Sequence, residues 1–163
     1  MFWQMNPQYM AHMIMIKEGV HPMVKKENEN TMVKKENENT IMTKSWGYEL
    51  WFANTANYCG KLLVVSHDKW SSKGNFHYHK IKDETFFVVE GALTLDIARE
   101  KGPVWERITL YTNDSCRVGP GVKHRFTSAL PIPCKFIEAS THHEDSDSYR
   151  CFYDEKEGDW IYD

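Results

Sequence analysis

The sequence has no long hydrophobic run and no large excess of charge. No segment approaches the roughly 18 consecutive apolar residues of a membrane-spanning helix, and the N-terminus lacks a basic start followed by an apolar stretch. The 163 residues include 20 Lys and Arg against 23 Asp and Glu, so no overall basic field attracts nucleic acid. These absences predict a cytoplasmic protein that binds neither membranes nor nucleic acids and acts on a small-molecule partner.

The cysteines form no closely spaced pair. Cys59, Cys116, Cys134 and Cys151 are widely separated and make no C-x-x-C motif, so zinc-ribbon and thioredoxin arrangements are unsupported and reduced thiols are expected. Apolar residues make up 41% of the chain and aromatic residues 13%. This is enough material for the core of one ordinary domain.

The N-terminal segment differs from the rest. All 8 methionines lie at or before Met42, and MVKKENENT occurs twice in tandem, at 23–31 and 32–40. Two copies of nine residues are too few and too short for a repeat fold, and their polar composition favours a solvated linker. A charged interaction arm and an internal translation start are the alternatives. We expect an N-terminal extension over 1–43, one domain over 44–154 and a C-terminal tail over 155–163.

Short apolar runs separated by turn residues follow this extension. No strong helical period occurs, and turn residues such as Glu90-Gly91 and Asn113-Asp114 separate the runs. The pattern predicts an all-β fold, an antiparallel sandwich or barrel. The expected strands are Leu62–Val65, Thr85–Val89, Ala92–Ile97, Trp105–Tyr111, Ser115–Val118, His124–Thr127 and Cys134–Ala139.

Three histidines and a glutamate stand where strands can gather them. His77 and His79 are two residues apart, so an extended strand turns both imidazoles to one face. Glu84 follows after a spacing that allows a turn, and His124 comes directly after the turn residues GPGVK. Three neutral imidazoles and a carboxylate suit a first-row divalent ion. Taken alone, however, an H-x-H pair is more often a pair of surface histidines.

The complete spacing carries a family resemblance. The pattern H-x-H-x4-E-x6-G, formed by His77, His79, Glu84 and Gly91, together with the downstream P-G-V-K-H, resembles the two signature motifs of the cupin superfamily. The resemblance covers roughly Lys44 to Asp154. It implies a single small antiparallel β-barrel, the cupin jelly roll. It also implies that one divalent transition metal (Mn, Fe, Ni or Zn) is bound by His77, His79, Glu84 and His124.

Four positions depart from the family pattern, and all lie in turns or at strand ends. Ser71, Asn113 and Gly119 stand where the family has Gly, Gly and Pro, and Ser128 replaces its final Asn. Asn is the non-glycine residue that best tolerates positive φ, so the turn at Asn113 can still form. The departures affect loop geometry more than the ligand set.

Two flanking segments resemble a narrower group. KSWGYE, beginning at Lys44, is similar to the opening of type II mannose-6-phosphate isomerases, and the acidic segment that ends at Arg150 is similar to their tail. Sugar-isomerase cupins of the D-lyxose isomerase kind share this plan. The resemblance implies action on a sugar or sugar phosphate, although a Trp-Gly pair at a strand start is more often core packing than ligand contact.

Two residues are candidates for proton transfer. Glu138 is the preferred base, because an acid within an apolar strand needs a partner or a role; a salt bridge at the rim is the alternative. Lys123 directly precedes His124 and could hold a carboxylate or phosphate, although a solvated turn residue is the commoner role.

Two further residues are candidates for substrate binding. Arg150 suits bidentate recognition of an anion, unless its neighbours Asp145 and Asp147 pair with it. His142 and His143 are adjacent and face opposite ways on an extended segment, so at most one enters the site. We predict His142 as a supporting group; a polar surface loop is the alternative.

Three functions are compatible with these observations. The first is a metal-dependent sugar or sugar-phosphate isomerase or epimerase that proceeds through an enediolate. The second is a non-haem iron dioxygenase, and the third is a noncatalytic sugar-binding or structural cupin. Because small cupins often pair through their sheets, we also expect a homodimer, with Trp46, Trp51 and Phe52 as candidate contacts.

Overall fold

The computed structural model describes residues 40–98 and 105–162. The tandem repeat lies outside these residues except for Thr40. In this part of the chain the structure contains strands and two short 3-10 turns but no α-helix, which confirms the all-β prediction. Accordingly, no helix here is long and apolar enough to cross a membrane.

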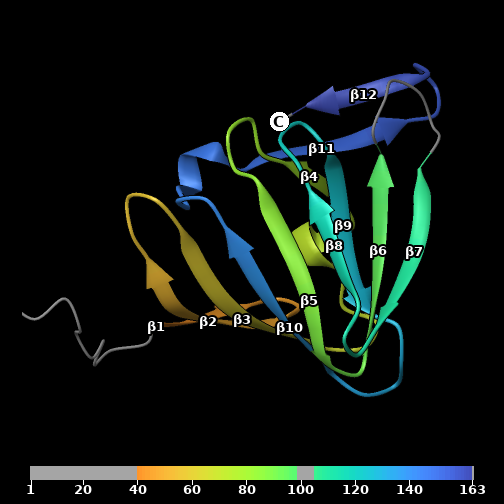
Figure 1. The fold of residues 1–163 in the computed structure, drawn as a ribbon. Helices are drawn as coiled ribbons and strands as arrows, with labels where there is room; N and C mark the ends of the chain where they lie inside the picture. The colour runs from red at the N-terminus through yellow and green to blue at the C-terminus, as the bar shows by residue number, and fades with distance from the viewer. Residues whose placement is uncertain (1–39, 99–104, 163) are drawn as a thin grey trace, which may run out of the picture. The chain divides into compact units, whose positions relative to one another are not determined.

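Within residues 40–98 and 105–162, twelve strands form two six-stranded sheets, called sheets A and B (Figure 1). The strands of sheet A, in spatial order, are β1 (Thr40–Lys44), β2 (Gly47–Asn54), β3 (Cys59–Val65), β10 (Cys134–Ser140), β5 (Glu84–Glu90) and β8 (Ser115–Val118). Those of sheet B are β12 (Asp159–Tyr162), β11 (Tyr149–Asp154), β4 (Phe76–Tyr78), β9 (Lys123–Ser128), β6 (Ala92–Ala98) and β7 (Glu106–Tyr111). All seven strands expected from the sequence are present.

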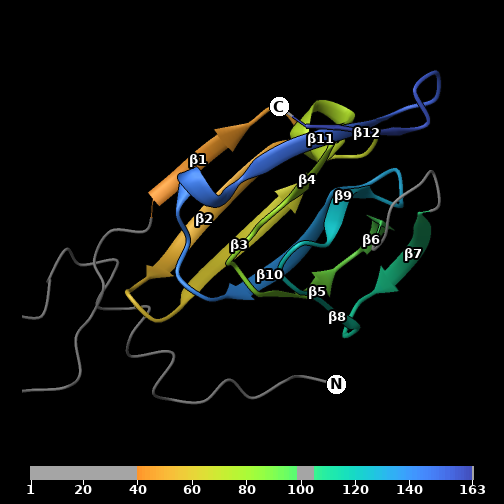
Figure 2. The same cartoon turned by 90° about the horizontal axis from the view of Figure 1, so that it is seen from above.

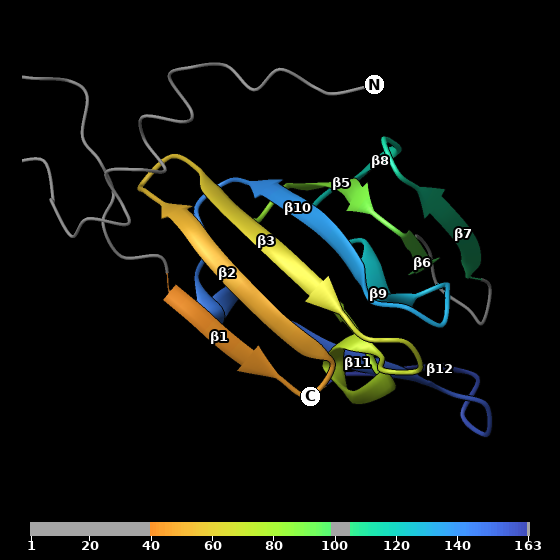
Figure 3. The same ribbon diagram turned by 90° about the horizontal axis from the view of Figure 1, so that it is seen from below.

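The two sheets form an open sandwich. Every strand pair within them is antiparallel, and the order of the sheet A strands can be followed in Figure 3. β1 and β8 are the edges of sheet A, and β12 and β7 are the edges of sheet B. Within the described residues no edge strand pairs with another, so the predicted jelly roll is present as two sheets that do not close into a barrel.

The main core fills the space between the sheets. Alternation along the strands turns Leu63, Phe86 and Phe136 inward, each at most 1% exposed. Phe126 from sheet B makes T-shaped contacts with Phe86, Phe136 and Trp46, at centroid distances of 5.2–5.9 Å. Burial of each such aromatic side chain contributes on the order of 2–3 kcal/mol.

The aromatic residues predicted for a dimer contact have different positions. Trp46 belongs to the core, which confirms its packing role. The Trp51 indole donates a hydrogen bond to Glu49 (2.8 Å) and packs edge-on against His143. Phe52 is 43% exposed. Of the three, only Phe52 is exposed, whereas Trp51 is partly buried and Trp46 is buried. The dimer remains a prediction.

Two turns of the resemblance motif have the backbone conformation that their residues favour. Asn113 has φ of 75°, as expected for the residue that replaces the family's glycine. Gly91 joins β5 to β6 with φ of 86°. A Cβ there would also lie 3.2 Å from the Pro133 carbonyl oxygen, so both conformation and space favour glycine.

Strands are present on both sides of the predicted domain limits. β1 begins at Thr40, inside the predicted extension 1–43, and pairs with β2. β12 lies inside the predicted tail 155–163 and pairs with β11, as Figure 2 shows from above. Its Trp160 is 3% exposed and packs against Phe76. The limits 1–43, 44–154 and 155–163 remain a prediction.

Candidate metal centre

Three imidazoles converge on the inner face of sheet B. His77 on β4 is paired directly with His124 on β9. His79 lies two residues after His77, directly after the end of β4. Paired residues of antiparallel strands share a face, and residues two apart return to it. One ring nitrogen from each imidazole lies within 4.8 Å of the other two. This cluster could hold a metal ion.

The second ring nitrogen of each imidazole contacts an oxygen of the protein. His79 Nδ1 lies 2.6 Å from the Asp147 carbonyl oxygen, and His124 Nδ1 lies 3.0 Å from the Val122 carbonyl oxygen. His77 Nδ1 lies 3.2 Å from the Ser72 hydroxyl. Contacts of this kind orient metal-binding imidazoles. The two carbonyl oxygens also place the proton of His79 and His124 on Nδ1, which leaves Nε2 of these rings for a ligand.

Glu84 brings a carboxylate from the opposite sheet. Its Oε1 lies 2.9 Å from His124 Nε2 and 3.8 Å from His79 Nε2. These three atoms are buried and make no hydrogen bond of acceptable geometry. Because burying polar atoms without partners is costly, a divalent cation among them would satisfy all three. The donor set therefore fits Mn, Fe, Ni or Zn.

Burial and neighbouring charges hold two of the imidazoles and the Glu84 carboxyl in the protonation states that bind a metal ion. Burial lowers the pKa of His79 to about 4 and holds the pKa of His77 well below its usual range. Burial alone would raise the pKa of Glu84. Contact with His124 and the charge of the Lys82 ammonium outweigh this effect and hold the pKa of Glu84 well below its ordinary value. At neutral pH His77 and His79 are thus neutral and Glu84 is ionised.

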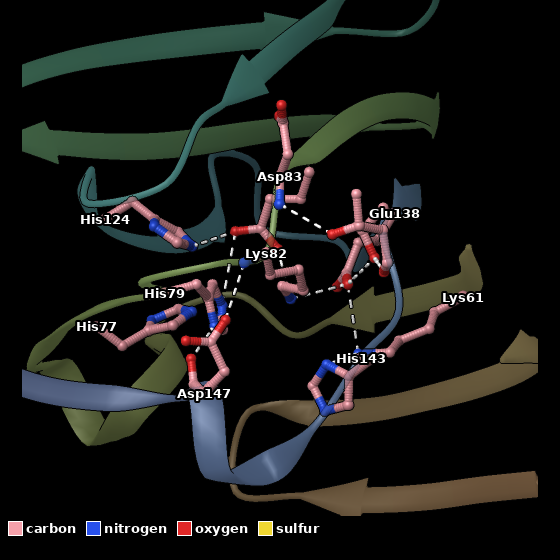
Figure 4. A network of polar contacts seen from close by, with 12 residues as sticks. Lys61, His77, His79, Lys82, Asp83, His124, Glu138, His143 and Asp147 are labelled. Carbon is pink, nitrogen blue, oxygen red and sulfur yellow. Dashed lines mark hydrogen bonds and ion pairs between the residues drawn. The ribbon is translucent and has the colours of Figure 1, made fainter. Parts of the chain in front are cut away.

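A buried network of alternating charges extends from this cluster. Lys82 Nζ lies 2.6 Å from Glu84 Oε2 and 3.0 Å from Glu138 Oε1. Lys61 Nζ lies 3.3 Å from Glu138 Oε1 and 3.1 Å from His143 Nδ1. Figure 4 shows Lys82 between the imidazoles and Glu138. Both lysines are at most 4% exposed.

Sequence reasoning did not identify either lysine. Lys61 interrupts the apolar strand CGKLLVV at an inward-facing position, the same signal that pointed to Glu138 on β10. Lys82 lies in the turn between two metal-ligand candidates, where a lysine is usually solvated. Lys82 can be buried because its ammonium contacts the carboxylates of Glu84 and Glu138. Neither carboxylate belongs to a residue adjacent to Lys82 in the sequence.

Glu138, the predicted base, lies inside this network. Its carboxylate is 6% exposed, so the alternative role of a salt bridge at the rim becomes an ion pair in the interior. Burial would raise its pKa, but Lys82 and Lys61 lower it overall. Glu138 is therefore ionised at neutral pH and lines the same cavity as His77.

Two other predicted residues lie elsewhere. Lys123 Nζ lies 5.1 Å from the ring centroid of Trp160 and is not among the residues that line the cavity. His142 is exposed, with Nδ1 2.7 Å from the Thr55 carbonyl oxygen. His143 lines the cavity in its place. Only one of the two adjacent histidines enters, but it is the one that the sequence analysis did not choose.

The cluster opens into a cavity of about 370 Å³. Its lining is mixed, with core aromatics such as Phe86 and Phe126 beside the charged groups. Arg150 is part of this lining because β11 pairs it with His77 on β4. A volume of this size falls within the range of small-molecule sites.

The comparisons with known proteins are informative at the level of structure alone. No protein-family profile matches the sequence, and no curated protein is similar to it. Among solved structures, the chain is similar to the capsular polysaccharide assembling protein CapF of Staphylococcus aureus, at TM-score 0.57 and 17% identity over 69% of this chain and 31% of CapF. Oxalate decarboxylase of Bacillus subtilis gives TM-score 0.60 and 12% identity over 69% of this chain and 30% of that one.

A third similar structure is the hydroxypropylphosphonic acid epoxidase of S. wedmorenis. It gives TM-score 0.55 and 18% identity over 69% of this chain and 60% of that one. The chain thus spans about a third of CapF and of oxalate decarboxylase. At these identities the likeness shows the fold, and the fold of the described residues is that of the cupins.

Proposed function

We propose that this chain is a metal-dependent enzyme that isomerises or epimerises a sugar or sugar phosphate. The observation that carries the proposal is the position of Glu138. This ionised, buried carboxylate lines the same cavity as His77, His79 and Glu84, and His124 completes the donor cluster with the two other imidazoles. A metal ion and a separate base are the two components that proton transfer beside a carbonyl requires.

The metal, when bound by these four residues, would polarise a carbonyl and stabilise an enediolate. Glu138 would take the proton from the carbon beside that carbonyl. The ammonium contacts of Lys82 and Lys61 both fall on Oε1, so we assign proton uptake to Oε2. Glu84 and Glu138 raise the pKa of Lys82, although burial opposes them. Its ammonium therefore stays charged and favours negative charge developing nearby.

The names of the similar structures do not choose the reaction. One is a decarboxylase, one an epoxidase and one a capsular polysaccharide assembling protein. Function must therefore be argued from the site. Here the site offers a base and a polar cavity, which suit a hydroxylated substrate. The sugar-isomerase resemblance of the segments at Lys44 and Arg150 supports the same reading.

Deuterium exchange tests the proposal. The protein, loaded separately with Mn²⁺, Fe²⁺, Ni²⁺ or Zn²⁺, is incubated in D₂O with aldoses, ketoses and their phosphates, and NMR follows deuterium at the carbon beside the carbonyl. We expect incorporation and a new isomer for one substrate class. A sugar that binds without exchange would contradict the proposal and favour a noncatalytic cupin. Oxygen uptake by the Fe²⁺ form without exchange would favour a dioxygenase.

A further inference from the structure

Two cationic side chains line the cavity without a protein partner. Within the described residues, neither the Arg150 guanidinium nor the Lys73 ammonium makes a hydrogen bond or ion pair, and both residues are exposed where they line the cavity. They differ in this from Lys61 and Lys82, whose ammonium groups are buried and contact Glu138.

Arg150 is placed beside a candidate metal ligand. The β11–β4 register pairs Arg150 with His77. The two side chains therefore share one face of sheet B, with Cβ atoms about 5 Å apart. A guanidinium in this position can bind one end of a small molecule while the imidazole cluster holds the other.

The two carboxylates considered above as partners of Arg150 are engaged elsewhere. Asp147 accepts backbone N–H groups of Lys80, Ile81 and Lys82 at 2.8–3.3 Å. Asp145 Oδ1 lies 3.2 Å from His143 Nε2. The expected alternative, in which these acids neutralise Arg150, is therefore absent from this part of the structure.

Lys73 reaches the same cavity from a constrained turn. Ser72 and Lys73 have φ of 52° and 57°, a left-handed conformation that costs a non-glycine residue on the order of 1–2 kcal/mol. The same turn holds the Ser72 hydroxyl 3.2 Å from His77 Nδ1. The turn thus places one hydroxyl against a metal-ligand candidate and one cation at the cavity.

The charge balance of the lining is positive. Five lysine and arginine residues line the cavity against four carboxylates, in a chain whose net charge is -3. Of these, the buried lysines Lys61 and Lys82 are balanced by Glu84 and Glu138. A divalent metal would add two further positive charges. A neutral ligand would leave this excess uncompensated, whereas an anion would reduce it.

We propose that the ligand of this cavity carries an anionic group, a carboxylate or a phosphate, and that Arg150 and Lys73 bind it. This deepens the proposed function, on which it rests for the metal at the other end of the ligand. Arg150 makes the directional, two-pronged contact, and Lys73 adds a point charge.

Calorimetry with three small probes tests this proposal. The full chain, loaded with one equivalent of Zn²⁺ and freed of excess metal, is titrated with inorganic phosphate, with glycolate and with ethylene glycol, a neutral counterpart of glycolate. We expect one of the two anions to bind at least tenfold more tightly than ethylene glycol. Preference for phosphate or for glycolate identifies which anionic group the site takes.

Matched variants assign the binding to the two residues. Arg150→Gln should weaken anion binding about tenfold or more, Lys73→Gln should weaken it less, and Lys135→Gln, which removes an equal charge outside the cavity, should not. All three should keep their Zn²⁺. Equal anion affinity in Arg150→Gln and Lys135→Gln would overturn the proposal, as would a Zn²⁺-loaded protein that binds neither anion. Failure to bind Zn²⁺ would instead count against the proposed function.

Discussion

Lys82 Nζ lies 2.6 Å from Glu84 Oε2, so a buried ammonium holds the oxygen of this carboxylate that does not contact the imidazoles. The other oxygen, Oε1, lies 2.9 Å from His124 Nε2. Glu84 is therefore presented to the histidine cluster through a single oxygen. Because Lys82 also contacts Glu138, one side chain connects the candidate metal ligand to the proposed base.

Replacing Lys82 by methionine should make the metal-free protein less stable. The change leaves Glu84 without its cation in the interior, and breaking a buried pair costs about 3–5 kcal/mol. Zn²⁺ should restore part of this loss, so the metal should stabilise Lys82→Met more than the unsubstituted chain. Urea unfolding with and without Zn²⁺ measures both effects.

The controls for this prediction are Lys82→Arg, which keeps the charge, and Lys135→Met, which removes an exposed lysine. Both should resemble the unsubstituted chain more closely than Lys82→Met does. A metal-free Lys82→Met protein of unchanged stability would contradict the role given to Lys82.

Replacing Ser72 by alanine should weaken metal binding. The hydroxyl contacts His77 Nδ1 at 3.2 Å, and loss of such an orienting contact typically lowers metal affinity about 10–100-fold. Competition with a zinc chelator of known affinity measures the change. Ser146→Ala removes an exposed hydroxyl of the η2 turn (Asp145–Asp147) and serves as the control. Equal affinity in both variants would show that Ser72 does not orient His77.

Replacing Glu138 by glutamine should separate metal binding from proton transfer. Glutamine keeps the shape of the side chain but cannot take up a proton, so deuterium exchange should slow by about 10²–10⁴-fold while Zn²⁺ content stays the same. An exchange rate equal to that of the unsubstituted chain would remove Glu138 as the base. Ser140→Ala, which removes a weaker contact to Glu138 at 3.3 Å, should have a small effect.

Asp96 should contribute to stability in a pH-dependent way. It is 0% exposed and accepts from Arg107 at 2.7 Å and from Arg125 at 2.9 Å. Burial would raise its pKa, but the two guanidinium groups lower it overall. As the pH falls, Asp96 is therefore protonated in the unfolded chain at a higher pH than in the folded protein. The contribution is complete above the unfolded pKa of about 3.9 and is lost as the pH falls through the lower folded value.

Asp96→Asn should accordingly be less stable at neutral pH by about 1–3 kcal/mol. It should also lack this part of the acid-induced loss of stability. Unfolding by urea at several pH values between 2 and 7 tests both points. The same pH dependence in the variant and the unsubstituted chain would show that Asp96 does not contribute in this way.

The fold could be predicted largely from local sequence patterns. Apolar runs such as Thr85–Val89 define strands because alternation and β-branched residues favour extended, half-buried backbone. β12 gives a weaker signal, because it has four residues and contains the charged Asp159 and the exposed Tyr162. The jelly roll is confirmed, but whether its two sheets close into a barrel depends on how the sheets curve, which no local pattern reports.

The candidate metal cluster could be proposed because its residues lie in two compact motifs. The remainder of the site is assembled by contacts between segments far apart in sequence. Lys61 and Glu138 are brought together only by the pairing of β3 with β10. His143, not His142, enters because the Asn54 side chain contacts the His143 backbone at both its N–H and its carbonyl. Such pairings cannot be read from the spacing of residues.

Metal content tests the central claim most directly. The full chain is purified without an affinity tag or chelator and analysed by mass spectrometry beside the double variant His77→Ala/His79→Ala, with circular dichroism to confirm that both are folded. We predict about one Mn, Fe, Ni or Zn ion per unsubstituted chain and almost none in the folded variant. A metal-free chain that takes up no ion on titration, or a folded variant with undiminished metal, would contradict the account.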